Sequence, residues 1–314
     1  MILILGVTAS GKNKLAFSLA KSLDAEIISI DSMKVYRRMD IGTAKPSIEQ
    51  RELVKHHLID IIEPSESFNV GAFHEAALGA IEEIKGRGKA IVAVGGTSLY
   101  IKALLCGLFH GPGTDEQVRV QLRARVDAEG LAELHRELSA VDPVAAERIN
   151  PHDSKRIIRA LEVYTITGKP ISGFQKQWET HNEQTGQSDF GHDWTIIGLR
   201  REKADTGSRI NARVKKMILA GFVDEVKSLL AEERPLSKQA RCAIGYAEII
   251  RHLEGQIDLI EAAELIKKNT RRLAKGQRTW FKTFKNVHWL DIEAQEQIEN
   301  ILERTIRLLD QIRA

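Results

Sequence analysis

The sequence predicts an α/β fold: a P-loop-type parallel sheet with flanking helices and an all-helical insertion domain. Up to about Gly111, short apolar runs alternate with helical stretches, which is typical of a parallel sheet covered by helices. After Gly111-Pro112-Gly113 the pattern is helical to about Phe174 and contains no strand candidate. We therefore expect a core made of residues 1–112 and 192–314, with a helical insertion over residues 113–191.

The individual elements follow from the spacing of apolar residues. Runs of strand length are Ile2–Leu5, Glu26–Ile30, His57–Ile61, Ala90–Val94, Trp194–Leu199 and Val287–Leu290. Helical periodicity marks Lys14–Leu23, Ala72–Lys85 and Thr97–Leu105 between the first strands. The polar stretch Gln175–Asp193 predicts a loop or linker between the insertion and the core.

Composition excludes several classes of protein. The chain has 314 residues, of which 43% are hydrophobic and 28% charged, as in ordinary globular proteins. Its first apolar run has no basic region before it, which predicts a core strand rather than a signal peptide. No apolar stretch reaches the about 20 residues that span a bilayer. Cys106 and Cys242 lie far apart, which suits a reducing compartment, and we expect a cytoplasmic protein without membrane contact.

A glycine-rich turn, G-V-T-A-S-G-K-N, follows the first strand and precedes a helix. Backbone N–H groups of such a turn and the helix N-terminus attract phosphate, and Lys12 reaches the outer phosphates. The predicted phosphate-binding residues here are Gly6, Val7, Thr8, Ala9, Ser10, Gly11, Lys12 and Asn13. Asn13 replaces the Ser or Thr whose hydroxyl normally holds Mg²⁺, so the turn predicts phosphate binding more strongly than nucleotide hydrolysis. The alternative is a plain glycine-rich turn.

Polar residues follow the second and fourth predicted strands. Asp31 ends the second strand, and in an open parallel sheet this position lies beside the glycine-rich turn. A carboxylate there could hold Mg²⁺ through water or accept a proton, and the alternative is a helix cap. Thr97 follows Gly95-Gly96 at the start of a helix, where its hydroxyl could face a ligand or simply cap the helix.

The net charge is only +3, but it is unevenly distributed. Residues 266–285 contain eight Lys or Arg and no acid, and five of them recur at helical spacing: Lys268, Arg271, Lys275, Arg278 and Lys282. A row of cations suits a row of phosphates, whereas the alternative is a solvated basic face. The intervening Leu273, Trp280, Phe281 and Phe284 are expected to pack this helix onto a core.

Several blocks together resemble a known family. These are the glycine-rich turn, D-S-M-K-V-Y-R-R-M-D-I-G-T-A-K-P (Asp31–Pro46), H-H-L-I-D (His56–Asp60), G-G-T-S-L-Y (Gly95–Tyr100), D-S-K-R-I-I-R-A-L-E-V-Y (Asp153–Tyr164), A-I-G-Y (Ala243–Tyr246) and T-R-R-L-A-K-G-Q-R-T-W-F (Thr270–Phe281). In this order they closely resemble the tRNA dimethylallyltransferases, also called tRNA isopentenyltransferases. The resemblance runs from Ile2 to about Asp291.

The resemblance implies transfer of a dimethylallyl group from dimethylallyl diphosphate to N6 of the adenosine immediately 3′ of a tRNA anticodon, with Mg²⁺ as cofactor. The glycine-rich turn would hold the departing diphosphate, Lys12 would neutralise it, Asp31 would be the general base and Thr97 would lie beside the target base. A monomer is expected. The positions implied to contact tRNA are Asp31, Ser32, Met33, Lys34, Thr97, Arg119, Lys155, Arg156, Ile157, Ile158, Arg159, Arg241, Arg271 and Lys275.

Four residues depart from the family pattern. Asn13 is a weaker Mg²⁺ ligand than a hydroxyl, and Ser98 replaces a small or apolar residue. Lys203 stands where an Arg is expected to grip the diphosphate, and Gly276 replaces an Arg inside a helix. These departures leave two alternatives open: a prenyltransferase acting on free adenosine phosphates, and an RNA-binding relative whose catalysis is weakened. The long insertion and the basic helix favour tRNA over a mononucleotide.

Overall fold

The computed structural model describes residues 1–108, 111–175 and 193–313. Its contacts divide the chain into two compact units, which we describe separately: Met1–Gly107 with Gln187–Ala314 (unit 1), and Leu108–Gly186 (unit 2). The sequence placed the corresponding boundaries at residues 112/113 and 191/192. The predicted polar loop Gln175–Asp193 lies outside the described residues from residue 176 to residue 192.

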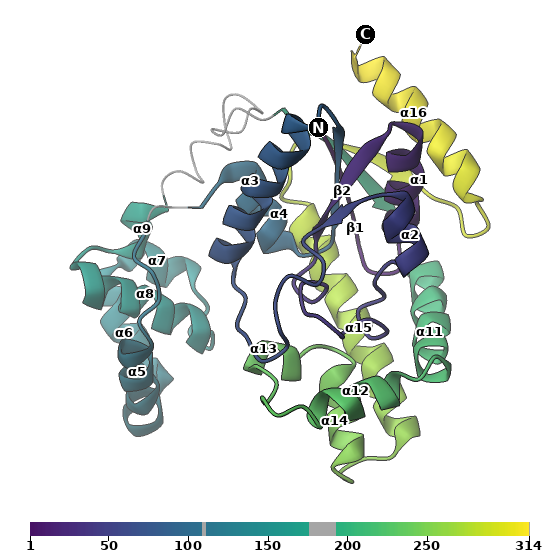
Figure 1. Ribbon diagram of the computed structural model, residues 1–314. Helices are drawn as coiled ribbons and strands as arrows, with labels where there is room; N and C mark the ends of the chain where they lie inside the picture. The colour runs from purple at the N-terminus through teal and green to yellow at the C-terminus, as the bar shows by residue number, and fades with distance from the viewer. Residues whose placement is uncertain (109–110, 176–192, 314) are drawn as a thin grey trace. The chain divides into compact units, whose positions relative to one another are not determined.

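Unit 1 is built on a six-stranded sheet in the order β3-β2-β4-β1-β5-β6 (Figure 1). Every neighbouring pair of strands is parallel, which confirms the predicted α/β fold. The strands are β1 (Ile2–Gly6), β2 (Ala25–Ile30), β3 (His56–His57), β4 (Ala90–Gly95), β5 (Thr195–Arg200) and β6 (Val287–Asp291). The carboxyl ends of β1, β2 and β4 lie side by side, because these three strands are neighbours in the sheet.

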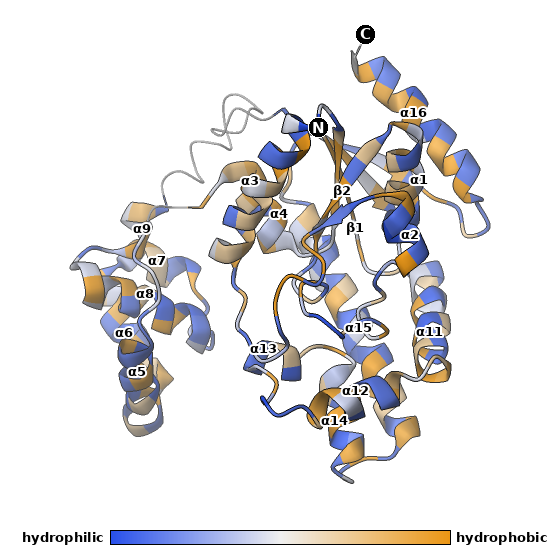
Figure 2. Cartoon of the chain, viewed as in Figure 1, coloured by the Kyte–Doolittle hydropathy of each residue, from blue (hydrophilic) through white to orange (hydrophobic). Residues whose placement is uncertain are grey.

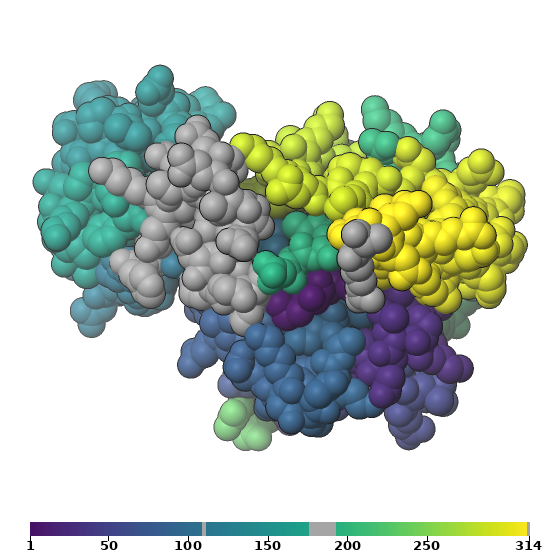
Figure 3. Space-filling view, turned by 90° about the horizontal axis from the view of Figure 1, so that it is seen from above, coloured from purple at the N-terminus to yellow at the C-terminus, as the bar shows by residue number. Residues whose placement is uncertain are grey.

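Helices cover both faces of this sheet. Those of unit 1 are α1 (Lys12–Ser22), α2 (Ile48–Leu53), α3 (Val70–Gly86), α4 (Ser98–Cys106), α11 (Lys203–Leu219), α12 (Phe222–Leu230), α13 (Lys238–Arg241), α14 (Tyr246–Leu253), α15 (Leu259–Phe281) and α16 (Ile298–Arg313). Helix α16 packs on α1, and the space-filling view shows it in yellow beside the purple N-terminal segment (Figure 3). Helices α3, α4 and α15 cover the opposite face.

The alternation of side chains along β1 explains why the strand is apolar throughout (Figure 2). Ile2 and Ile4 belong to the core cluster beneath α1 and α16, whereas Leu3 and Leu5 belong to the cluster beneath α3 and α15. All four side chains are 4% exposed or less. A strand buried on both faces needs a continuous apolar run rather than an alternating one.

The third strand is much shorter than predicted. The sequence predicted a strand over His57–Ile61, but β3 contains only His56 and His57. Leu58 and Asp60 adopt left-handed backbone conformations with φ of 62° and 56°, which a strand does not tolerate. The chain turns there because the Asp60 carboxylate accepts hydrogen bonds from Lys45 and Arg51 instead of continuing along the sheet.

Unit 2 is entirely helical over its described residues. Its helices are α5 (Glu116–Glu129), α6 (Leu131–Val141), α7 (Pro143–Arg148), α8 (Ser154–Thr167) and α9 (Ile171–Phe174). Leu134, Leu138, Ile157 and Leu161 form the centre of its own apolar core. Within the described ranges of both units, no helix combines the length and apolar character needed to cross a membrane.

Candidate active site

The glycine-rich turn forms a tight loop between β1 and α1. Its backbone closes through a hydrogen bond from Ser10 N to Val7 O of 3.1 Å, and Ala9 and Gly11 have positive φ of 64° and 97°. Gly11 is the N-cap residue of α1 and offers no side chain to its first turn. The first N–H groups of α1 therefore remain available to an anion, which the helix dipole also favours.

Three arginines brace this loop, and the sequence analysis missed all of them. Arg201 Nε donates to Ser10 O at 2.8 Å, and Arg209 Nε donates to Ala9 O at 2.9 Å. Arg213, one helical turn beyond Arg209, reaches Thr8 Oγ1 at 3.4 Å. One sign of this role was present in the sequence: Arg209 and Arg213 are four residues apart, so both lie on the same face of α11. Because guanidinium groups hold the loop carbonyls, its N–H groups are left for a ligand.

Gln277 of α15 joins the loop to the end of β4. Its Oε1 accepts from Thr8 N at 2.8 Å and its Nε2 donates to Gly96 O at 2.8 Å. A Cβ at Gly96 would lie 2.5 Å from Gln277 Nε2, so a larger residue there would have to displace this bridging amide. Gln277 is 7% exposed, but it follows Lys275-Gly276 and precedes Arg278 in a strongly basic segment, so its buried role cannot be recognised from the sequence.

Asp31 and Thr97 come together at the ends of β2 and β4. Asp31 Oδ1 accepts from Met33 N at 2.9 Å and Lys34 N at 3.3 Å, so it caps a turn rather than a helix. Thr97 Oγ1 accepts from Ser32 N at 3.1 Å and makes no capping bond to α4. Within the described part of the chain, Asp31 Oδ2 has no hydrogen-bond partner. One oxygen thus fixes the carboxylate while the other can accept a proton.

Two cavities share the loop residues Lys12 and Asn13 together with Arg213. The first, which we call the Asp31 cavity, has a volume of about 410 Å³ and is also lined by Asp31, Thr97, Lys34 and Trp280, among others. The second, the α11 cavity, has a volume of about 800 Å³ and extends along α11 and α2. The loop is therefore open to small molecules from two directions.

The Asp31 cavity is strongly cationic. Burial and the neighbouring charge of Lys34 lower the pKa of Lys12 to about 7, although Asp31 opposes this shift. Burial likewise lowers the pKa of Lys34 to about 8, again against the attraction of Asp31. Burial also lowers the pKa of Arg213. Three cations face one carboxylate, and such a cavity favours an anionic ligand.

Around the loop, the described residues offer few side-chain ligands for Mg²⁺. Asn13 is exposed and has an amide instead of the hydroxyl expected at its position. Asp31 is the one carboxylate lining its cavity, and it lies among cations. Among the described residues no three His, Cys, Asp or Glu side chains are grouped as ligands for a metal ion. Mg²⁺ is usually held by one or two carboxylates together with substrate phosphates and water, and in this cavity Asp31 and the Asn13 amide are the side chains that could take part.

Lys203 lies elsewhere than predicted. It begins α11, and together with Arg278 and Arg304 it lines a separate cavity at the ends of β5 and β6. It lines neither of the two cavities beside the loop. Lys203 is six residues before Arg209, which places it on a different side of the helix from the arginines that contact the loop. The arginines of α11 that contact the loop are Arg209 and Arg213.

The basic row of α15 is solvent-exposed at Lys268, Arg271, Lys275 and Lys282, and half-buried at Arg278. The core side of the helix is formed by Ala262, Ile266, Ala274, Gln277 and Phe281. Leu273 was predicted in the core but is 44% exposed, and it lines the mouth of the Asp31 cavity with Trp280. Arg271 donates to Asn211 on α11, and Arg241 is paired with Glu254.

The candidate RNA-contacting residues of unit 2 divide into two groups. Arg119 and Arg159 both bind the Glu162 carboxylate, whose side chain is fully buried. Ile157 is fully buried in the core, so its side chain is not available to RNA; Ile158 is partly buried beside it. Lys155 and Arg156 remain exposed at the start of α8. Lys155 is thus exposed to a partner, whereas Arg156 already forms an ion pair with Asp153 at 3.2 Å.

The chain is similar to a well-populated group of proteins. The family model described as IPP transferase matches residues 34–284. The tRNA dimethylallyltransferase of Geobacter metallireducens is 46% identical over 93% of this chain and 92% of that protein. The tRNA dimethylallyltransferase of Thermotoga neapolitana is 43% identical over 98% of this chain and 97% of that protein.

Solved structures agree. The tRNA isopentenylpyrophosphate transferase of Bacillus halodurans is 40% identical with a TM-score of 0.70, over 99% of this chain and 96% of that one. A eukaryotic dimethylallyltransferase, solved acting on tRNA, is 28% identical with a TM-score of 0.73, over 93% of this chain and 73% of that one. The chain therefore belongs to the IPP transferase family of prenyl-transferring enzymes, as its sequence motifs predicted.

Proposed function

We propose that this enzyme transfers a dimethylallyl group from dimethylallyl diphosphate to N6 of the adenosine immediately 3′ of a tRNA anticodon. The observation that carries the proposal is the Asp31 cavity, where a carboxylate with one uncommitted oxygen faces the loop residue Lys12. A base and a phosphate-binding loop in one cavity suit an alkyl transfer in which a proton and a diphosphate both leave.

The chemistry divides between the two sides of this cavity. The bond from N6 to the allylic carbon forms while the bond from that carbon to the diphosphate oxygen breaks, and the diphosphate leaves with the electron pair. Asp31 Oδ2 takes the N6 proton, because Oδ1 is held by Met33 N and Lys34 N. The N–H groups at the start of α1 and the Lys12 ammonium stabilise the departing charge.

The mouth of the cavity supports an RNA substrate. Trp280 and Leu273 line it, and an aromatic side chain there can stack on a base that has been flipped out of the anticodon loop. The exposed cations of α15 lie on the same helix and suit the flanking phosphates. An adenosine monophosphate would need no such row, which favours tRNA over a free nucleotide.

A transfer assay tests this proposal. The enzyme is incubated with unmodified tRNA, dimethylallyl diphosphate and Mg²⁺, and the nucleosides are then analysed by mass spectrometry. We expect one prenylated adenosine per tRNA, located next to the anticodon. The parallel reaction contains adenosine monophosphate in place of tRNA. Prenylation of the mononucleotide alone would favour the adenosine-phosphate alternative, and tRNA binding without transfer would favour an RNA-binding relative with weakened catalysis.

A further inference from the structure

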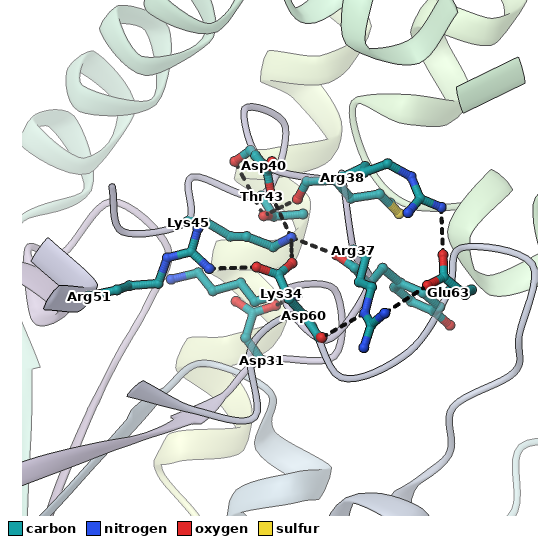
Figure 4. A network of polar contacts seen from close by, with 12 residues as sticks. Asp31, Lys34, Arg37, Arg38, Asp40, Thr43, Lys45, Arg51, Asp60 and Glu63 are labelled. Carbon is teal, nitrogen blue, oxygen red and sulfur yellow. Dashed lines mark hydrogen bonds and ion pairs between the residues drawn. The ribbon is translucent and has the colours of Figure 1, made fainter. Parts of the chain in front are cut away.

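Two buried lysines of unit 1 have opposite environments (Figure 4). The Lys45 side chain is 2% exposed, and its ammonium donates to Tyr36 O, Asp40 Oδ1 and Asp60 Oδ1 at 2.5–2.6 Å. Lys34 is 6% exposed, yet none of the described residues accepts a hydrogen bond from its ammonium. The Lys34 ammonium is not among the buried polar atoms that lack a partner, and Lys34 lines the Asp31 cavity, so a ligand can reach it there whereas Lys45 is already occupied.

Lys34 lies where a ligand can reach it. It lines the Asp31 cavity together with Lys12 and Arg213, and its charge is close enough to Lys12 to disfavour the protonated form of that residue. Arg213 also has unused donor capacity, because its contacts to Thr8 Oγ1 and Thr43 O are long, at 3.4 and 3.5 Å. An anion in the cavity would satisfy all three groups at once.

The missing hydroxyl at position 13 of the loop indicates that the anion bound in this cavity is a diphosphate. A diphosphate on the loop carries several negative charges, and Asn13 offers no hydroxyl to the Mg²⁺ that would offset them. We propose that Lys34 is a second diphosphate-binding cation, and that Lys34 and Arg213 supply positive charge that a loop hydroxyl and its metal ion would otherwise supply. This inference rests on the proposed function, because that function places the diphosphate on the loop beside Lys12.

Fixed cations and a diffusible metal ion predict different responses to metal removal. If Lys34 binds the diphosphate, the protein retains affinity for it when Mg²⁺ is absent. When Lys34 is replaced by a neutral residue, Mg²⁺ has to neutralise more of the negative charge of the diphosphate. The variant should therefore depend on Mg²⁺ more steeply than the wild type, whereas a lysine that serves packing alone would leave this dependence unchanged.

The direct test is calorimetric titration of the full chain with inorganic diphosphate in the presence of EDTA. Loss of one charge-assisted contact predicts that Lys34→Gln binds about 10–100-fold more weakly than the wild type. Lys215→Gln is the matched control, because Lys215 is an exposed lysine of α11 that lines neither cavity beside the loop. We expect its affinity to stay within about twofold. In millimolar Mg²⁺, the affinities of Lys34→Gln and the wild type for diphosphate should differ less than they do in EDTA.

Equal affinities of Lys34→Gln and wild type in EDTA would overturn the inference while leaving the proposed function intact. A wild-type protein that binds no diphosphate with or without Mg²⁺ would instead contradict the role of the loop itself. Lys34→Arg, which retains the charge, and Lys34→Met, which retains the length, separate charge from packing. Weakening in both variants alike would also overturn the inference, since only the neutral one should lose affinity.

Discussion

Two charge clusters in this molecule are built on opposite principles. In unit 2 the buried Glu162 accepts hydrogen bonds from Arg119, from Arg159 and from Asp115 N, so every charge in the cluster has a partner. In unit 1 the Asp31 cavity gathers Lys12, Lys34 and Arg213 around one carboxylate and leaves most of their hydrogen-bonding groups unused. The first cluster is closed, whereas the second is open to a ligand.

The difference separates residues that stabilise the fold from residues that act on a substrate. Burial raises the pKa of Glu162, but the two arginines and Asp115 N outweigh burial and lower it. In the Asp31 cavity burial prevails, and the pKa of both lysines falls. Substitutions in the closed cluster should therefore change stability, and substitutions in the open one should change transfer. Each of the following experiments tests this difference between the two clusters.

The largest effect is expected from Asp31→Asn. The asparagine oxygen can still accept from Met33 N and Lys34 N, but the side chain can no longer take a proton. Prenyl transfer should fall by about 10²–10⁴-fold, the usual size of general-base catalysis, while tRNA affinity and the melting temperature change little. Single-turnover kinetics measure this, with the exposed Asp127→Asn as control. Transfer near the wild-type rate would show that Asp31 only caps its turn.

The closed cluster predicts the opposite result. Glu162→Gln removes the charge that Arg119 and Arg159 share while its side chain stays fully buried, so it should lower the free energy of unfolding by about 3 kcal/mol. Glu129→Gln breaks an exposed pair with Arg125 that solvent screens, so its effect on the free energy of unfolding should be much smaller. Urea unfolding of the full chain compares the two. Similar losses would mean that burial does not distinguish these ion pairs.

Some of the residues that form these two clusters can be recognised from the sequence, and others cannot. The glycine-rich turn, Asp31 and Thr97 are recognisable because their function requires particular residue types at strand ends. Gln277 and Arg201 are not, because their roles arise from contacts between residues about 190 to 270 positions apart. Arg119 and Arg159 were assigned to RNA, since a sequence does not reveal that a buried glutamate already binds them.

The secondary structure was likewise predicted correctly in some places and wrongly in others. The long parallel strands were predicted within about one residue, because burial on both faces imposes continuous apolar runs. The strand after His57 was wrong, since Asp60 is held by Lys45 and Arg51, which a local pattern does not record. Leu273 was wrong for a related reason: helical periodicity finds the buried side of α15 but not the cavity that exposes one of its leucines.

A second closed cluster makes stability depend on pH. Hydrogen bonds from Arg87, opposed by burial and helped by His57, lower the pKa of Glu26 from its ordinary value of 4.5 to about 2. Because the folded state binds the proton more weakly, this stabilisation is complete above about pH 5 and is lost as the pH falls towards 2. Between pH 6 and pH 3 the loss should be about 2 kcal/mol, and Glu26→Gln should abolish this part of the dependence.

The basic row of α15 predicts a smaller effect. Lys275 is exposed on α15, and Lys275→Ala should weaken tRNA binding and reduce the slope of log affinity against log salt by about 0.7–0.9, the loss of one phosphate contact. Lys21→Ala on α1 is the control, because it removes one exposed charge away from α15. Equal slopes of log affinity against log salt for wild type and Lys275→Ala would mean that the basic row is an ordinary solvated face of the helix.

The smallest expected effect tests whether the open cluster can be converted into a metal site. Asn13 is exposed at the second residue of α1 and lines both cavities beside the loop. Asn13→Thr restores a short hydroxyl that can ligate Mg²⁺ in near-octahedral geometry. The Mg²⁺ concentration for half-maximal transfer should then fall by a few-fold, about 1 kcal/mol or less, with tRNA affinity unchanged. Lower activity at every Mg²⁺ concentration would instead mean that the asparagine amide is itself required by its cationic surroundings. Superimposable Mg²⁺ titrations of the two proteins would show that position 13 takes no part in metal binding, and the positive charge of Lys12, Lys34 and Arg213 would then account for the diphosphate without it.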